Sequence, residues 1–227
     1  MLTAEEFDAI RLSLAVAGMS VLWTLPVATG LGYWLARSRS GRNWLIELLI
    51  NLPLVLPPVV TGFLLLVLFG QKGWFGPLLT AIGLKIVFTW WGAVLAAGCM
   101  ALPLMVRTIR LAFGSIDPRL EMVARTLGAS RWRTFWTISV PLAMPGILSG
   151  IVLGFARSLS EFGATIMIAG NIAGKTRTIP LAIYSLTHRP DGWEMTWRLI
   201  AVSIVLAAVC LLICDRLERR QVRYAAA

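Results

Sequence analysis

Charged side chains are scarce in this sequence. Asp, Glu, Lys and Arg make up 14% of the 227 residues, whereas a soluble domain carries roughly 25%. Hydrophobic residues account for 58%, and the mean hydropathy is +0.78. This balance excludes an ordinary soluble fold and predicts a chain embedded in a membrane.

Side chains that bind metals or perform catalysis are also few. The single histidine, His188, has no second histidine or carboxylate at ligand spacing. Cys210 and Cys214 are four apart on one helical face without a third ligand, and Cys99 stands alone, so we expect reduced packing residues. No His–carboxylate cluster or Ser–His–Asp arrangement supports a membrane-embedded enzyme. The sequence therefore predicts no catalytic residue and no metal site.

Long uncharged runs are abundant instead. Four of them cover residues 12–36, 48–70, 86–106 and 134–156. Each meets the ~20 residues that a helix needs to cross ~30 Å of hydrocarbon. A fifth run, residues 199–214, is extended by residues 195–197, with the Arg198 side chain reaching outward to water. We predict an all-α polytopic membrane protein of about five transmembrane helices, with residues 1–227 forming one domain.

Arginine is concentrated on alternate connections between these runs. The 21 Lys and Arg outnumber the 11 acidic residues, giving a net charge of +10. Most of them follow the first run, link the third to the fourth, or follow the fifth: Arg37, Arg39, Arg42, Arg107, Arg110, Arg119, Arg125, Arg131, Arg133, Arg216, Arg219, Arg220 and Arg223. The positive-inside rule therefore predicts an outer N-terminus and a cytoplasmic C-terminus. We interpret the charge as a topology signal and a contact for anionic membrane lipid, not for nucleic acid.

The second run is interrupted by prolines. Pro53, Pro57 and Pro58 precede Thr61 at membrane depth. Each proline removes a backbone donor and costs ~3 kcal/mol within a regular helix. Broken helices are tolerated where protein or a water-filled cavity satisfies the freed carbonyls, and they commonly line transport pathways. We interpret these residues as lining a pathway; the alternative is a packing kink.

Two opposite charges follow the fourth run. Arg157 and Glu161 are four residues apart, and we predict that they pair, because an unpaired charge in a span costs ~2.5–3.5 kcal/mol. The hydroxyls of Ser158, Ser160 and Thr165 lie close by in the sequence. Either the pair only fixes the orientation of a helix, or this segment forms a gate or lines a pathway. The carboxylate disfavours a high-affinity anion site on Arg157.

A polar cytoplasmic loop at residues 113–137 has the signals of a short helix. Asp117 suits the N-cap, Pro118 the first helical position and Gly128 the C-terminal stop. One apolar face is expected to carry Leu120, Val123, Ala124 and Leu127. Such a helix is marginal alone, so this face needs a membrane surface or a groove on another protein.

The same loop resembles a known signature. Glu121, Gly128, Ile138 and Pro141 have the spacing of the loop found in ABC importer permeases, Glu-Ala-Ala, three residues, Gly, nine residues, Ile-x-Leu-Pro. Val replaces the usual Ala at position 123 and the usual Leu at position 140. The resemblance implies a type I ABC importer permease fold in which this loop is the coupling helix, seated in a cleft of an ATPase.

On this resemblance the coupling residues are Glu121, Ala124, Leu127, Gly128, Ile138 and Pro141. Glu121 is expected to pair with a basic group of the ATPase. The chain has no Gly-x-x-x-x-Gly-Lys-Ser/Thr run, so ATP and Mg would bind to a separate ATPase chain and this chain itself needs no cofactor.

Three further stretches bear on the cargo. Residues 156–164 are similar to the oxyanion permeases for molybdate and sulfate, and residues 52–60 and 176–184 look like the molybdate permease family. This resemblance implies a homodimer in the inner membrane, served by two ATPases and a periplasmic or surface molybdate-binding protein. The alternatives are a sulfate, thiosulfate or tungstate permease and, more remotely, an ion-coupled secondary transporter. The latter would need a buried acid, and the one candidate, Glu161, is already matched with Arg157.

Overall fold

The computed structural model describes residues 2–38 and 43–225, with side chains up to residue 217. Its helices are α1 (Ala4–Arg37), α2 (Asn43–Val55), α3 (Pro58–Phe69), α4 (Gly76–Ala81), α5 (Trp90–Gly114), α6 (Pro118–Thr126), α7 (Arg131–Thr134), the π-helical η1 (Phe135–Ser139), α8 (Val140–Leu159), α9 (Gly163–Ala169), α10 (Ile179–Thr187) and α11 (Trp193–Ala225). These ranges contain no strand, so the all-α prediction is confirmed. Arg39, Arg42 and the side chains of Arg219, Arg220 and Arg223 lie outside the described residues.

Four helical stretches are long and apolar enough to cross a membrane. They are α1, α5, the continuous α7–η1–α8 stretch and α11. The predicted span at residues 48–70 is instead two helices, α2 and α3, bent by 113°. The described residues therefore hold four spans, or five if the bent pair counts as one, in agreement with the prediction.

The bend in the second span occurs at two of its three prolines. Residues 56 and 57 separate α2 from α3, and Pro58 begins α3. Pro53, in contrast, stays inside α2. Adjacent prolines fix two φ angles, and each disfavours the helical region for the residue before it, whereas a single proline only kinks a helix. The predicted break is confirmed at Pro57 and Pro58 but not at Pro53.

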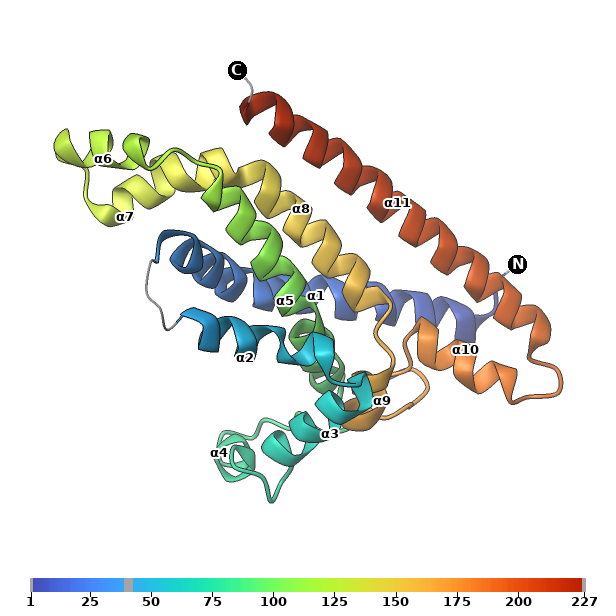
Figure 1. Cartoon of the computed structure of the whole chain (residues 1–227). Coiled ribbons are helices and arrows are strands. Elements are labelled where there is room, and N and C mark those ends of the chain that lie inside the picture. The colour runs from blue at the N-terminus through green and yellow to red at the C-terminus, as the bar shows by residue number, and fades with distance from the viewer. Residues whose placement is uncertain (1, 39–42, 226–227) are drawn as a thin grey trace.

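The bundle centres on α1, α5 and α8, which pack side by side (Figure 1). Small residues allow close approach: a Cβ added to Gly32 of α1 would lie 2.9 Å from Ile109 Cγ2 of α5. Ile109, Met105 and Phe113 of α5 are fully buried in the core that these helices share. This core supports the elements at both ends of the bundle.

Acidic residues at the start of α1 form ion pairs with arginines of later segments at one end of the bundle. A Thr3–Glu6 capping box begins α1 eight residues earlier than the uncharged run suggests. Glu5 pairs with Arg177 and Arg189. Glu6 pairs with Arg198 at 2.8 Å, so this arginine, whose side chain keeps 31% exposure, also binds the buried carboxylate.

The two ends of the bundle differ in charge. The start of α1, α10 and the first turns of α11 lie at one end, and α6, α7 and the last turns of α1 lie at the other (Figure 1). The arginine-rich end that carries α6 is the cytoplasmic one by the positive-inside rule. The predicted topology, with an outer N-terminus, is consistent with this arrangement.

Candidate coupling and pathway sites

The helix α6 begins and ends where its sequence signals predict. Asp117 Oδ1 accepts a hydrogen bond from the backbone N–H of Arg119 at 2.9 Å, which caps the first turn. The backbone N–H of Gly128 donates to the carbonyl of Arg125 at 3.1 Å. Gly128 has φ +90°, a region in which a side chain is strained. The loop therefore turns sharply at the glycine and re-enters the membrane through α7.

No residue of α6 is buried, and several of its exposed side chains are apolar. Leu120, Met122, Val123 and the following Leu127 are exposed, with Leu127 at 83%. Ala124 is half-buried and lies three residues after Glu121, on the side that faces the rest of the chain. Leu120, Val123 and Leu127 of the predicted apolar face are thus exposed and Ala124 is half-buried, while Met122, on the other side of the helix, is exposed as well.

Glu121 anchors α6 to the bundle. One of its carboxylate oxygens accepts hydrogen bonds from Arg37 Nη2 at 2.7 Å and from Ser139 Oγ at 2.8 Å. Arg37 Nε lies 3.1 Å and 3.2 Å from the two oxygens. Within this chain the Glu121 carboxylate is paired with Arg37, the last residue of α1, and its pairing with a basic group of the ATPase stays a prediction.

Sequence reasoning missed both partners of Glu121. Arg37 lies 84 residues away in the chain and was counted only as a topology charge. Ser139 is part of the Ile-Ser-Val-Pro run, but its buried position could not be read from spacing. Only the folded chain brings α1, α6 and η1 to one point.

Ile138 and Pro141 lie in the helix that follows, away from α6. Pro141 has no backbone N–H and cannot continue a regular ladder, and the turn before it is the π-helical η1, where the N–H of Val140 bonds to Phe135. Ile138 is half-buried and Pro141 is exposed. They connect to α6 through their neighbour Ser139.

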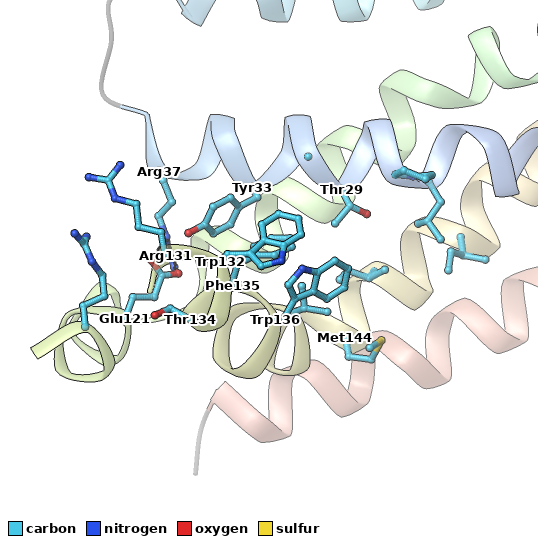
Figure 2. A pocket seen from close by; sticks show the side chains of 17 residues that line it. Thr29, Tyr33, Arg37, Glu121, Arg131, Trp132, Thr134, Phe135, Trp136 and Met144 are labelled. Atoms are coloured by element: carbon cyan, nitrogen blue, oxygen red, sulfur yellow. Dashed lines mark hydrogen bonds and ion pairs between the residues drawn. The ribbon is translucent and has the colours of Figure 1, made fainter. Parts of the chain in front are cut away.

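A cavity of about 1010 Å³ opens beside this anchor, between α1, α6, α7, η1 and α8. Figure 2 shows Arg37, Glu121 and Arg131 at one end and Thr29, Trp136 and Met144 at the other. Aromatic rings of Tyr33, Trp132 and Phe135 lie between them. The cavity is thus charged at its cytoplasmic end and apolar toward the middle of the membrane.

The two breaks in the membrane helices meet on the other side of the bundle. A Cβ added to Gly163 of α9 would lie 2.8 Å from Pro58 Cβ, and one added to Gly62 would lie 2.6 Å from Ala164 Cα. The start of α3 therefore packs directly on the start of α9. The structure brings together the predicted pathway segments around Pro58, Thr61, Glu161 and Thr165.

The predicted Arg157–Glu161 pair is confirmed, with Nη1 and Oε2 2.8 Å apart. The helix α8 ends at Leu159, however, so Glu161 lies in the link to α9 and not on the same helix. Its other oxygen accepts the backbone N–H of Ala164 at 2.8 Å. Glu161 is 2% exposed and joins α8 to α9.

The remaining predicted pathway residues have separate environments. Ser158 is buried and accepts a hydrogen bond from Ser20 of α1 at 2.9 Å, which is a packing contact. Ser160 is exposed and donates to the carbonyl of Arg157. Thr61 and Thr165 are buried, and the Thr61 hydroxyl has no hydrogen-bond partner among the described residues. Pro57 is exposed at the bend.

Neither site has the composition of a metal centre. Within residues 2–38 and 43–225, no group of three or more His, Cys, Asp and Glu side chains could hold a metal ion. Cys99, Cys210 and Cys214 form no disulfide.

The fold matches solved transporter structures. A chain described as the "MetNI methionine ABC transporter" in inward-facing conformations superposes with a TM-score of 0.70 and 15% identity, covering 94% of both chains. At this identity the likeness shows the fold alone. The fold is therefore that of a type I ABC importer permease.

Sequence comparisons give the family. The model of the "Binding-protein-dependent transport system inner membrane component" matches residues 28–223, and the chain belongs to this family of inner-membrane permease subunits. The "Molybdenum transport system permease protein ModB" of Haemophilus influenzae is 52% identical over 216 residues, covering 95% of this chain and 94% of the relative. Its namesake in Escherichia coli K12 is 50% identical over 220 residues, covering 96% of each.

Proposed function

We propose that two copies of this chain form the membrane pathway of a molybdate importer driven by ATP hydrolysis on two separate ATPase subunits. The observation that carries the cargo assignment is the 50–52% identity, over nearly the whole chain, to permeases named for molybdenum transport. A binding protein on the outer side would deliver the anion. One chain with five spans encloses too little space for a pathway alone, which supports a homodimer.

The coupling loop, residues 113–137 of the single permease domain 1–227, would receive the ATPase movement. The exposed apolar side chains of α6 offer docking area to a groove on another protein. Ala124 and Glu121 face inward, and the Arg37–Glu121–Ser139 contacts connect that movement to α1 and to the helix leading into α8. Leu127 and Gly128 shape the exposed tip, and Ile138 and Pro141 continue the connection into the membrane.

The meeting of the two broken helices supports a pathway or gate there. The α2–α3 bend at Pro57 and Pro58 packs on the link between α8 and α9. Discontinuous helices of this kind can shift as short rigid pieces without breaking a long helix. Arg157 is neutralised by Glu161, so we assign selectivity mainly to the binding protein. Sulfate, thiosulfate and tungstate therefore remain the alternative cargoes.

Uptake by the assembled transporter tests the cargo. Vesicles containing the permease, the ATPase and the binding protein are given labelled molybdate or labelled sulfate, with ATP or without it. We expect ATP-dependent uptake of molybdate and little uptake of sulfate. Preferential sulfate uptake would establish the alternative cargo. Uptake driven by an ion gradient without ATP would instead indicate a secondary transporter.

The docking surface on α6 is tested by Leu127→Asp. Leu127 is 83% exposed, so the substitution costs the fold little, but it places a charge where an apolar groove is expected to close. We expect at least a ten-fold loss of ATPase copurifying with the permease, equivalent to ~1.4 kcal/mol of binding. The matched control is Leu78→Asp on α4, also exposed and at the outer side. If the two variants copurify with equal amounts of ATPase, the assignment of α6 as the docking surface is wrong.

A further inference from the structure

We propose that the cavity beneath α6 binds one anionic phospholipid of the cytoplasmic leaflet, with its phosphate held by Arg125 and Arg131 and an acyl chain lying along α8. Figure 2 shows the side chains that line the cavity, between α1 and the α7–η1–α8 helix. This site is separate from the outer surface of α6 and from the Arg157–Glu161 segment. It does not depend on which anion is transported.

Charge is the first observation that favours this occupant. Arg125 and Arg131 both line the cavity and are exposed. Within the described part of the chain neither forms an ion pair with a carboxylate, whereas Arg37 in the same wall is paired with Glu121. Two uncompensated guanidinium groups at the cytoplasmic end of a membrane cavity attract the anionic lipids of that leaflet. Arginine also suits phosphate because it donates two parallel hydrogen bonds.

The distribution of side chains along the cavity matches the amphipathy of a lipid. Below the arginines, Trp132 and Trp136 are 71% and 53% exposed, as expected for rings at the level of lipid headgroups. Deeper in the membrane the lining becomes aliphatic, with Met144, Ile147 and Ile151 of α8. A soluble anion would have no use for this apolar part.

The depth of the cavity also corresponds to one leaflet. Its lining on α8 runs from Val140 to Ile151, which at the helical rise spans about 16 Å. Half of a bilayer's hydrocarbon core is about 15 Å thick. An acyl chain whose phosphate lies at the arginines would therefore reach the inner end of the cavity near the bilayer midplane.

Lipid retention by the purified transporter is the direct test. The complex is prepared in detergent, given phosphatidylglycerol or phosphatidylcholine, and analysed by native mass spectrometry for bound lipid. We expect phosphatidylglycerol to be retained and phosphatidylcholine to be lost. Arg125→Gln combined with Arg131→Gln should weaken phosphatidylglycerol binding about 30-fold. The matched control, Arg119→Gln with Arg133→Gln, removes two charges from the same loop at positions that do not line the cavity and should change retention little.

A second variant tests the apolar part without changing charge. Gly30 lines the cavity, and a Cβ added there meets no atom within 4 Å, so Gly30→Leu should fill the acyl position without disturbing α1. Its matched control is Gly18→Leu, which is also unobstructed on α1 but lies outside the cavity. Retention should fall with Gly30→Leu and persist with Gly18→Leu.

Two results would overturn the proposal. One is that the Arg125→Gln/Arg131→Gln variant and the Gly30→Leu variant both retain as much phosphatidylglycerol as their control variants. The other is a disulfide that forms between two permease copies through Met144→Cys and whose yield does not change when phosphatidylglycerol is added. That result would mean that a second copy of the chain covers the cavity. Both measurements are independent of molybdate uptake, so failure here leaves the proposed function standing.

Discussion

Glu121 is a single carboxylate that serves three elements at once. It belongs to α6, and it accepts hydrogen bonds from the last residue of α1 and from Ser139 of η1. Its side chain is 14% exposed and that of Arg37 is 20% exposed, so water screens this pair less than a surface pair. The residue holds α6 in a defined orientation rather than contributing to the docking surface.

Removing Arg37 should therefore uncouple ATP hydrolysis from transport. A charge-assisted hydrogen-bonded pair contributes ~1.5–3 kcal/mol, and without it Glu121 keeps only the hydrogen bond from Ser139 among the side-chain contacts described above. For Arg37→Gln we expect about a ten-fold fall in molybdate imported per ATP hydrolysed, with the complex still assembled. The measurement is uptake and ATPase rate on the same vesicles.

Arg110→Gln is the matched control for Arg37→Gln. Arg110 pairs with Glu47 at 2.8 Å, also toward the cytoplasmic side, and this ion pair involves no residue of α6. Uptake per ATP should stay near that of the unmodified chain. If both variants behave alike, the Glu121 anchor is not part of the coupling.

Besides pairing with Arg157, Glu161 accepts a hydrogen bond from the backbone N–H of Ala164. This second contact determines how exchanging the two charges affects stability. Exchanging Arg157 and Glu161 keeps an ion pair but places a donor where Ala164 N–H needs an acceptor. An unsatisfied buried N–H costs ~1–3 kcal/mol, so the swapped protein should melt at least ~2 °C lower than the unmodified chain although its ion pair is kept. Thermal unfolding in detergent measures the difference.

The swapped Arg110–Glu47 pair provides the comparison. Both side chains are more than a third exposed, and the Glu47 carboxylate accepts no backbone N–H among the described residues. This swap should leave the melting temperature nearly unchanged. Equal melting temperatures of the two swapped proteins would mean that Glu161 stabilises the fold only through its ion pair, and not through its hydrogen bond to the Ala164 N–H of α9.

At the scale of elements, the turn at Gly128 fixes where α6 ends. Proline at this position would force φ to about −65° in place of +90° and would remove the N–H that donates to Arg125. We expect Gly128→Pro to insert normally but to abolish ATP-dependent uptake. Membrane quantity and uptake are measured together.

Two alanine variants, Gly128→Ala and Gly114→Ala, test whether the loss of uptake depends on the backbone conformation at Gly128. Alanine in the left-handed region costs ~1–2 kcal/mol, so Gly128→Ala should reduce uptake without abolishing it. Gly114 ends α5 with ordinary φ and open space around it, so Gly114→Ala should transport normally. Normal uptake by Gly128→Pro would contradict the assignment of this turn.

Elements defined by local chemistry were predictable from the sequence, and those defined by distant contacts were not. Caps and stops such as Asp117 and Gly128 act over a few residues, so their pattern is visible in the chain. The break at Pro57 and Pro58 follows from backbone sterics, but the 113° angle depends on packing against α9. The Arg37–Glu121 pair joins residues 84 apart, and no periodicity indicates it.

At the scale of the whole molecule, the two ends should be accessible from opposite sides of the membrane. In a chain whose native cysteines are replaced, Leu78→Cys on α4 should react with an impermeant maleimide in intact cells. Leu127→Cys on α6 should react only after permeabilisation. Both positions are well exposed, at 64% and 83%, so differing reactivity reports location. The reverse pattern would invert the predicted topology.

The acidic start of α1 has a consequence for biogenesis. Glu5 and Glu6 are synthesised before their partners, which lie 172 to 192 residues later in the chain. At 5–20 residues per second, Glu6 waits on the order of 10–40 s before Arg198 exists to neutralise it. The outer end of α1 therefore has all its ion pairs only after α11 has been synthesised. A chain truncated before α11 lacks Arg198, so its Glu6 carboxylate has lost this ion-pair partner.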